Sequence, residues 1–145
     1  STWARRMLVP KVVVANQTSA IEAVADRDGA WIPGVPVTSV VPHRDRLLTA
    51  SVDEIEAVLT SPIASAFAWH AAAGTGLSPR AVRVSPATLA ALWWPAGDLG
   101  PAVDAFAAGR IVEGGRRVVA AYRLDDRLAD EVTSWWAALL PAAGG

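Results

Sequence analysis

The apolar pattern of this chain changes near residue 50, from short β-branched runs to segments that begin with helix-start signals. The run Lys11–Ala15 is rich in valine, which is typical of a buried strand. Asp28-Gly29 is a strong hairpin signal, so we expect it to join a strand over residues 21–25 to one over 30–32. Residues 35–41 are strand-like again, but the prolines around them cannot donate to a ladder, which predicts a position at a sheet edge or at bulges.

The second part of the chain carries several distinct helix starts. Ser51 and Glu54 have the spacing of a capping box, in which each side chain bonds the other residue's backbone N–H. Ser-Pro at 61–62 and 85–86 and Gly-Pro at 100–101 predict further starts, because proline is favoured in the first helical turn. We therefore expect a helix after Ser51 and helices over about 62–73, 85–92, 100–109 and 126–140.

Glycines and apolar spacing predict how these helices end and pack. Gly74 is a natural helix end, and Gly114-Gly115 is predicted to interrupt the helical pattern. In the last helix the buried stripe is predicted to be Leu128, Val132, Trp135 and Leu139.

Composition supports one α+β protein. The chain has 145 residues, of which 52% are apolar and 19% charged, enough apolar surface for a real core. We expect a small N-terminal sheet with the Asp28-Gly29 hairpin, packed with helices over residues 1–96, and a helical tail over 97–145. Residues 95–100 are the expected hinge between them. The chain begins Ser-Thr-Trp without methionine, which we interpret as a fragment of a longer protein.

Several kinds of chemistry have no residues to support them. Without cysteine, disulfides and thiolate metal sites are excluded. The only lysine is Lys11, so no phosphate-binding Gly-x-x-x-x-Gly-Lys motif is present. The two histidines have no acidic neighbour at metal-ligand spacing; we expect His70 to be half-buried in the core and His43 to be exposed. No window approaches the ~18 apolar residues of a membrane span, and we expect a cytoplasmic protein.

A longer pattern runs from residue 8 to residue 96. It opens with Lys-Val-Val-Val-Ala-Asn-Gln-Thr at 11–18 and continues through Ile-Glu-Ala-Val-Ala-Asp at 21–26. After a helix it has Gly-Thr-Gly-Leu-Ser-Pro-Arg-Ala-Val-Arg-Val-Ser at 74–85, a short helix and Leu-Trp-Trp-Pro at 92–95. This pattern resembles the TaqI-like C-terminal specificity domain of gamma-type adenine-N6 DNA methyltransferases of restriction-modification systems. The chain departs from the usual Leu-Pro-aliphatic-Pro ending at Trp93-Trp94-Pro95, and residues from 98 onward match no pattern of that family.

The resemblance implies a DNA target-recognition domain that is not itself an enzyme. An absent catalytic domain of the parent would bind S-adenosylmethionine and flip the target adenine out of the stack. Its Asn/Asp-Pro-Pro-aromatic loop has no counterpart here, because the only asparagine, Asn16, precedes Gln17 and Thr18. The implied partners are double-stranded DNA and that catalytic domain. The formal charge of −1 counts against DNA binding by this chain alone, so the whole enzyme would supply the phosphate contacts.

The candidate DNA contacts come from three segments: Asn16, Gln17, Thr18; His43, Arg44, Arg46; Gly74, Thr75, Gly76, Ser78, Arg80 and Arg83. Carboxamides pair with adenine N6/N7 and arginine pairs with guanine O6/N7. Glycine amides and the arginines near His43 suit phosphates, which set register without reading sequence. Each set has an ordinary alternative: a strand-ending turn, a helix C-cap, or arginines paired with acids or facing solvent.

The seven tryptophans raise a second hypothesis. We expect Trp69 and Trp135 in the core, and Trp93, Trp94 and Trp136 at a protein interface, because adjacent helical residues cannot share one face. The alternative function is then a protein-interaction or assembly domain without DNA contact. A small hydrolase has less support, since no acid-base constellation is visible. The tail arginines, from Arg116 to Arg127, are expected to form a salt-bridged solvent surface with the nearby acids.

Overall fold

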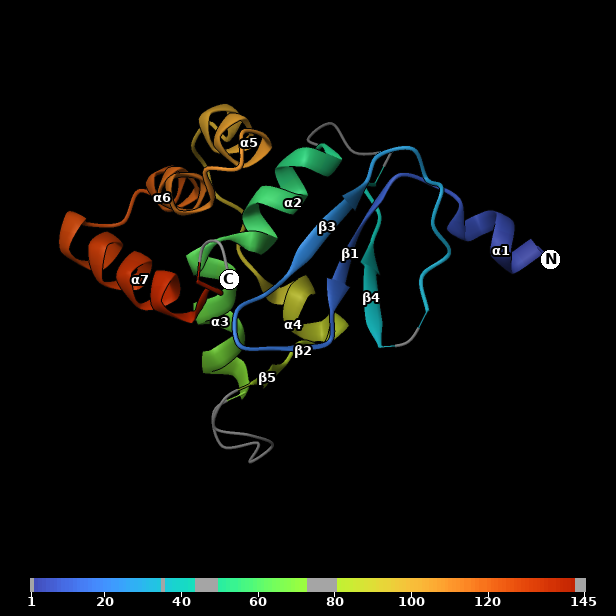
Figure 1. The fold of residues 1–145 in the computed structure, drawn as a ribbon, viewed down its shortest axis with the longest axis horizontal. Helices are drawn as coiled ribbons and strands as arrows, with labels where there is room; N and C mark the ends of the chain where they lie inside the picture. The colour runs from blue at the N-terminus through green and yellow to red at the C-terminus, as the bar shows by residue number, and fades with distance from the viewer. Residues whose placement is uncertain (1, 35, 44–49, 73–80, 143–145) are drawn as a thin grey trace.

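The computed structural model describes residues 2–34, 36–43, 50–72 and 81–142, and they form the α+β fold expected from the sequence. A three-stranded antiparallel sheet has the order β3-β1-β4 (Figure 1). Its central strand β1, Lys11–Ala15, pairs with β3, Ala23–Asp26, and with β4, Val37–Val40. The predicted strand at Lys11–Ala15 is confirmed, and β4 lies at the sheet edge, as the flanking prolines predicted.

The turn at Asp28-Gly29 forms, but the hairpin predicted across it is wrong. Gly29 has a φ of +66°, and a Cβ there would lie 2.6 Å from the backbone carbon of Val9. Residues 30–34 form no strand, and β3 pairs with β1 instead. The physical reason is the Asp26 carboxylate, which accepts hydrogen bonds from the backbone N–H of Ala30 (3.0 Å) and Trp31 (2.9 Å) and so removes them from any ladder.

Seven helices lie in the described residues: α1 Thr2–Met7, α2 Val52–Thr60, α3 Pro62–Ala72, α4 Pro86–Ala91, α5 Gly100–Ala107, α6 Ile111–Ala121 and α7 Asp126–Leu139. The predicted starts are confirmed. Ser51 and Glu54 make both bonds of a capping box, Ser85 caps α4 through the backbone N–H of Thr88, and α3 begins at Pro62. Of the described helices, none is both long and apolar enough to cross a membrane.

The predicted break at Gly114-Gly115 is wrong, because both glycines lie buried inside α6. A Cβ at Gly114 would lie 2.8 Å from the ring of Phe106, and one at Gly115 would lie 2.5 Å from the ring of Trp136. The glycines therefore admit two aromatic rings rather than end a helix.

The predicted orientation of α7 is also wrong. Trp136 is 0% exposed, so it does not belong to a protein interface, whereas Trp135 and Leu128 are exposed. The buried residues of α7 are Thr133 and Trp136. The tryptophan facing inward is the one whose ring fits over Gly115, so contacts with α6 set the rotation of the helix.

Two buried clusters share α2. Ile55 and Leu59 of α2 pack with the sheet residues Val12 and Val14 in the first cluster. In the second cluster, Ala57 and Val58 of α2 pack with Leu99, which precedes α5, and with residues of α5 and α6: Ala102, Val118 and Ala121. Figure 1 shows α2 and α3 between the sheet and helices α5–α7. The helical tail thus packs against α2 and α3 of this chain.

Candidate nucleic-acid interface

A two-stranded ribbon brings together two of the segments predicted to contact DNA. Strand β2, Gln17–Thr18, pairs antiparallel with β5, Val82–Arg83, with Gln17 opposite Arg83 and Thr18 opposite Val82. Directly opposite residues project to the same face of a sheet. Gln17 and Arg83 are exposed, whereas Val82 is buried. The ribbon therefore presents a carboxamide and a guanidinium side by side to solvent.

Asn16 holds this ribbon against the main sheet. Its backbone N–H donates to the carbonyl of Pro36 (3.1 Å), and its own carbonyl accepts from the N–H of Val84 (2.7 Å). Its side-chain Oδ1 accepts from the Thr38 hydroxyl (2.7 Å). A bidentate adenine contact uses both the oxygen and the nitrogen of a carboxamide. Because the oxygen of Asn16 is bonded to Thr38, Asn16 links the ribbon to the main sheet, and Gln17 is the carboxamide better placed for a bidentate contact.

The segment that follows β2 is hydrogen-bonded to α3. The Thr18 hydroxyl donates to the carbonyl of Ala20, and the N–H of Ile21 donates to the Ser65 hydroxyl (2.9 Å). The indole N–H of Trp69 donates to the carbonyl of Ser19 (2.8 Å), with Trp69 packed on the first cluster. These contacts fasten residues 16–21 to the core, so the exposed pair stands on a supported platform.

Arg83 differs from four other arginines of the molecule in its ion pairing. No ion pair joins Arg83 to another side chain among the residues placed in the structure. Four other arginines pair with carboxylates: Arg27 with Asp53 and Glu56, Arg110 and Arg117 with Glu113, and Arg127 with Glu131. The salt bridge predicted between the tail arginines and the acids beside them forms at Arg127, with Glu131, whereas Arg117 pairs with Glu113 instead. Within the described residues, the guanidinium of Arg83 is therefore exposed and in no ion pair.

The remaining predicted contacts do not all join the ribbon. Those that lie outside the described residues are Arg44, Arg46, Gly74, Thr75, Gly76, Ser78 and Arg80. His43 is exposed, as expected, but it follows β4 beyond Val40, which pairs with Val12. The ribbon follows Ala15 at the other end of β1, so His43 and Gln17 belong to opposite ends of the sheet. His70 is also exposed, in the last turn of α3, so its predicted half-buried position is wrong.

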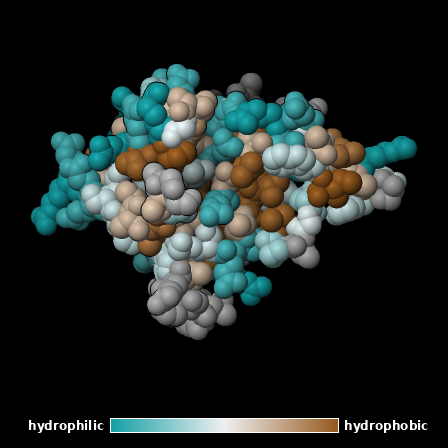
Figure 2. All heavy atoms as spheres, in the orientation of Figure 1, coloured by the Kyte–Doolittle hydropathy of each residue, from teal (hydrophilic) through white to brown (hydrophobic). Residues whose placement is uncertain are grey.

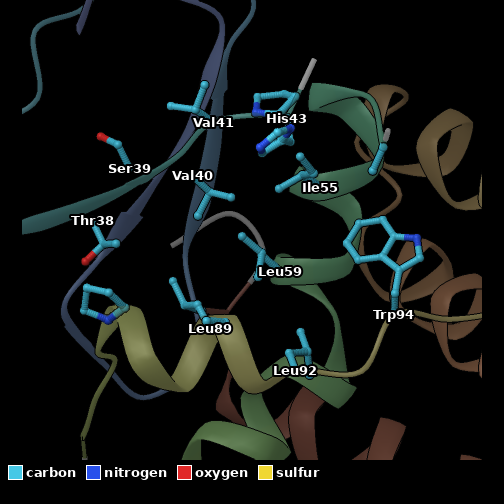
Figure 3. Close-up of a pocket in the computed structure, with 14 residues that line it drawn as sticks. Thr38, Ser39, Val40, Val41, His43, Ile55, Leu59, Leu89, Leu92 and Trp94 are labelled. Carbon is cyan, nitrogen blue, oxygen red and sulfur yellow. The ribbon is translucent and has the colours of Figure 1, made fainter. Parts of the chain in front are cut away.

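An apolar groove of about 420 Å³ lies between β4, α2 and α4. Val40, Ile55, Leu59, Leu89 and Leu92 line it, and Trp94 stands at one side, whereas Ser39 points away (Figure 3). The groove was not predicted, because its walls come from three segments of the chain that carry no shared motif.

Trp93, next to the groove, is 84% exposed, and Trp94 is 46% exposed. The backbone carbonyl of Trp93 accepts the Tyr122 hydroxyl (2.6 Å), which ties this pair to the end of α6. Burial raises the pKa of Tyr122 to about 12, so the hydroxyl that donates this bond stays protonated above the pH at which an ordinary tyrosine ionises.

Apolar side chains also gather over the region of the sheet in the view of Figure 2. The exposed large hydrophobic residues of the sheet and its connections include Val24, Trp31, Ile32 and Val41. A contiguous exposed apolar patch is typical of a surface that binds a protein or a membrane.

The fold and the exposed ribbon define an α+β protein with a candidate nucleic-acid contact and an apolar groove at the sheet edge. Comparison with protein families, curated proteins and solved structures finds no match to this chain. In the described part of the chain, no group of three or more His, Asp or Glu residues has the arrangement of a metal site.

Proposed function

We propose that this chain is the DNA target-recognition domain of an adenine-N6 DNA methyltransferase of a restriction-modification system. The observation that carries the proposal is the direct pairing of Gln17 with Arg83 on an exposed, anchored ribbon. The major groove admits a two-stranded ribbon, and these two side-chain types form the commonest specific contacts with purines. Methyl transfer, with S-adenosylmethionine, belongs to a catalytic domain of the parent, so this chain has no activity of its own.

The exposed apolar surface fits the same proposal. A catalytic domain that covers the open side of the sheet would bury residues such as Val24 and Trp31, which are exposed here. The net charge of −1 implies that the chain alone binds DNA weakly and mainly at low salt. The full enzyme would supply most of the phosphate contacts.

The test is fluorescence anisotropy of a labelled mixed-sequence duplex titrated with the chain at low salt. Arg83→Ala should weaken binding about tenfold, the effect of losing one bidentate or phosphate contact. The matched control is Arg116→Ala, which removes an exposed arginine of α6 for which the described residues show no ion pair. Equal affinities of the two variants, or no binding by the parent chain, would overturn the proposal.

A second function is supported by the exposure of Trp93 beside the groove. A protein-interaction or assembly domain would use Trp93, Trp94 and the groove, and it would leave Gln17 and Arg83 without a role. The same titration separates the two functions. In the first case the chain binds the duplex, Arg83→Ala weakens that binding and Trp93→Ala leaves it unchanged. In the second case the chain does not bind the duplex at all.

A further inference from the structure

We infer that the ribbon recognises an A·T base pair next to a G·C base pair, with Gln17 on the adenine and Arg83 on the guanine. The inference rests on the proposed function and names the DNA sequence element that the same site would select. It starts from the register of β2 and β5, in which Gln17 and Arg83 are direct partners.

Purine chemistry sets the number of base pairs involved. Gln matches the N6 donor and N7 acceptor of adenine, and Arg matches the O6 and N7 acceptors of guanine. Each base pair contains a single purine, so two bidentate purine contacts require two base pairs. One side chain per base pair is therefore the simplest match to this site.

The spacing of the two side chains favours neighbouring base pairs. Directly opposite residues of an antiparallel pair have Cβ atoms about 5 Å apart. Stacked base pairs are about 3.4 Å apart along the duplex, so the two long side chains need to converge only slightly to reach adjacent edges. Both side chains project from the exposed face of the ribbon, while Val82 and Val84 bury the other side in the first cluster.

The surroundings of the pair favour base edges over a purely electrostatic contact. Gln17 carries no charge, and its partner Arg83 is the ribbon's single ionic group among the residues described. A site built for phosphate alone would gain more from a second cation than from a carboxamide, since each phosphate neutralised adds to affinity. The carboxamide adds discrimination between bases instead.

The experiment measures the affinity of the chain for duplexes that share their flanks and cover every central dinucleotide step. We expect a step that places an A·T pair next to a G·C pair to bind about tenfold more tightly than a step made of two A·T pairs or of two G·C pairs. Gln17→Ala should remove only the adenine preference. Arg83→Lys should reduce the guanine preference while it keeps most of the affinity, because lysine retains the charge and lacks the planar fork.

Duplexes with 7-deazaadenine or 7-deazaguanine provide a second measurement that does not depend on the folding of a variant. Each should lose the preference contributed by its own base, because the N7 acceptor is absent. Binding that depends on Arg83 but is equal for all steps would indicate phosphate contact, and would overturn this inference while leaving the proposed function intact. A preference for the two purines separated by another base pair would also overturn it. No binding to any duplex would overturn the proposed function itself.

Discussion

At the scale of single residues, the most constrained side chains are Lys11 and Asp26. Lys11 is fully buried, and its ammonium donates to Asp26 Oδ2 (2.6 Å) and to the carbonyls of Met7 (2.9 Å) and Val9 (3.2 Å). Burial by itself raises the pKa of Asp26. Hydrogen bonds from Lys11 and from the N–H groups of Trp31 and Ala30 outweigh it and lower the pKa to about 2. The pair thus fastens the end of α1 and the turn after β3 to the sheet.

This pKa predicts how stability changes in acid. The pKa of Asp26 is about 2 in the folded chain against an ordinary value of 3.8, so its contribution to folding is complete above about pH 4. That contribution should be lost as pH falls toward about 2. Asp26→Asn should lower the urea midpoint at neutral pH and should flatten its fall between about pH 5 and about pH 2. Asp28→Asn, on the exposed turn nearby, is the control, and an Asp26→Asn profile parallel to the parent's would contradict the assignment.

At the scale of elements, the glycines of α6 decide how the tail packs. A Cβ atom at residue 115 would lie 2.5 Å from the ring of Trp136 and 3.0 Å from Cδ of Pro62. Helices α3, α6 and α7 therefore meet around one glycine. The indole N–H of Trp136 has no hydrogen-bond partner among the described residues, so shape rather than polar contact holds the ring in place.

Gly115→Ala tests this arrangement. Overpacking of this kind costs about 1–3 kcal/mol, which exceeds the gain of up to about 1 kcal/mol from replacing a helical glycine by alanine. We expect a lower free energy of unfolding in urea and a shifted Trp136 environment in near-UV circular dichroism. Gly34→Ala is the matched control, since nothing lies within 4 Å of the Cβ that it would add. A stabilised Gly115→Ala variant would show that the ring does not occupy this position.

At the scale of the whole molecule, α2 joins the two buried clusters into one structure. Ile55 and Leu59 face the sheet, while Ala57 and Val58 face the tail helices. Neither cluster can lose its contacts without exposing part of α2. The exposed ribbon, the apolar groove and the exposed apolar residues of the sheet all belong to the first 96 residues.

The shared helix predicts a single unfolding transition. Val12→Ala in the sheet and Val118→Ala in α6 remove side chains that are 0% exposed, and each should cost about 2 kcal/mol. Both should lower the same urea midpoint, measured in parallel by far-UV circular dichroism and tryptophan fluorescence. Two separated transitions, each sensitive to one of the substitutions, would mean that the sheet half and the tail fold independently.

The features that the sequence by itself determined are local ones. The starts of α2, α3 and α4 follow from Ser51, Pro62 and Ser85, because a cap or a helical proline acts within the first turn. The edge position of β4 follows from the missing N–H of its neighbouring prolines. Gln17 and Arg83 could be singled out as candidate readers from side-chain chemistry alone.

Tertiary structure decided everything that depends on distant segments meeting. In the tertiary structure β3 pairs with β1 rather than with residues 30–32, and Trp136 faces the core. Gly114 and Gly115 lie against aromatic rings of neighbouring helices. Gln17 pairs with Arg83, which lies 66 positions later in the chain, and the side chain of Asn16 accepts a hydrogen bond from Thr38 of the main sheet. Periodicity and caps describe how a residue sits in its own element. Which elements approach one another depends on how rings, backbones and buried charges fit across them, and that is settled only when the whole core closes.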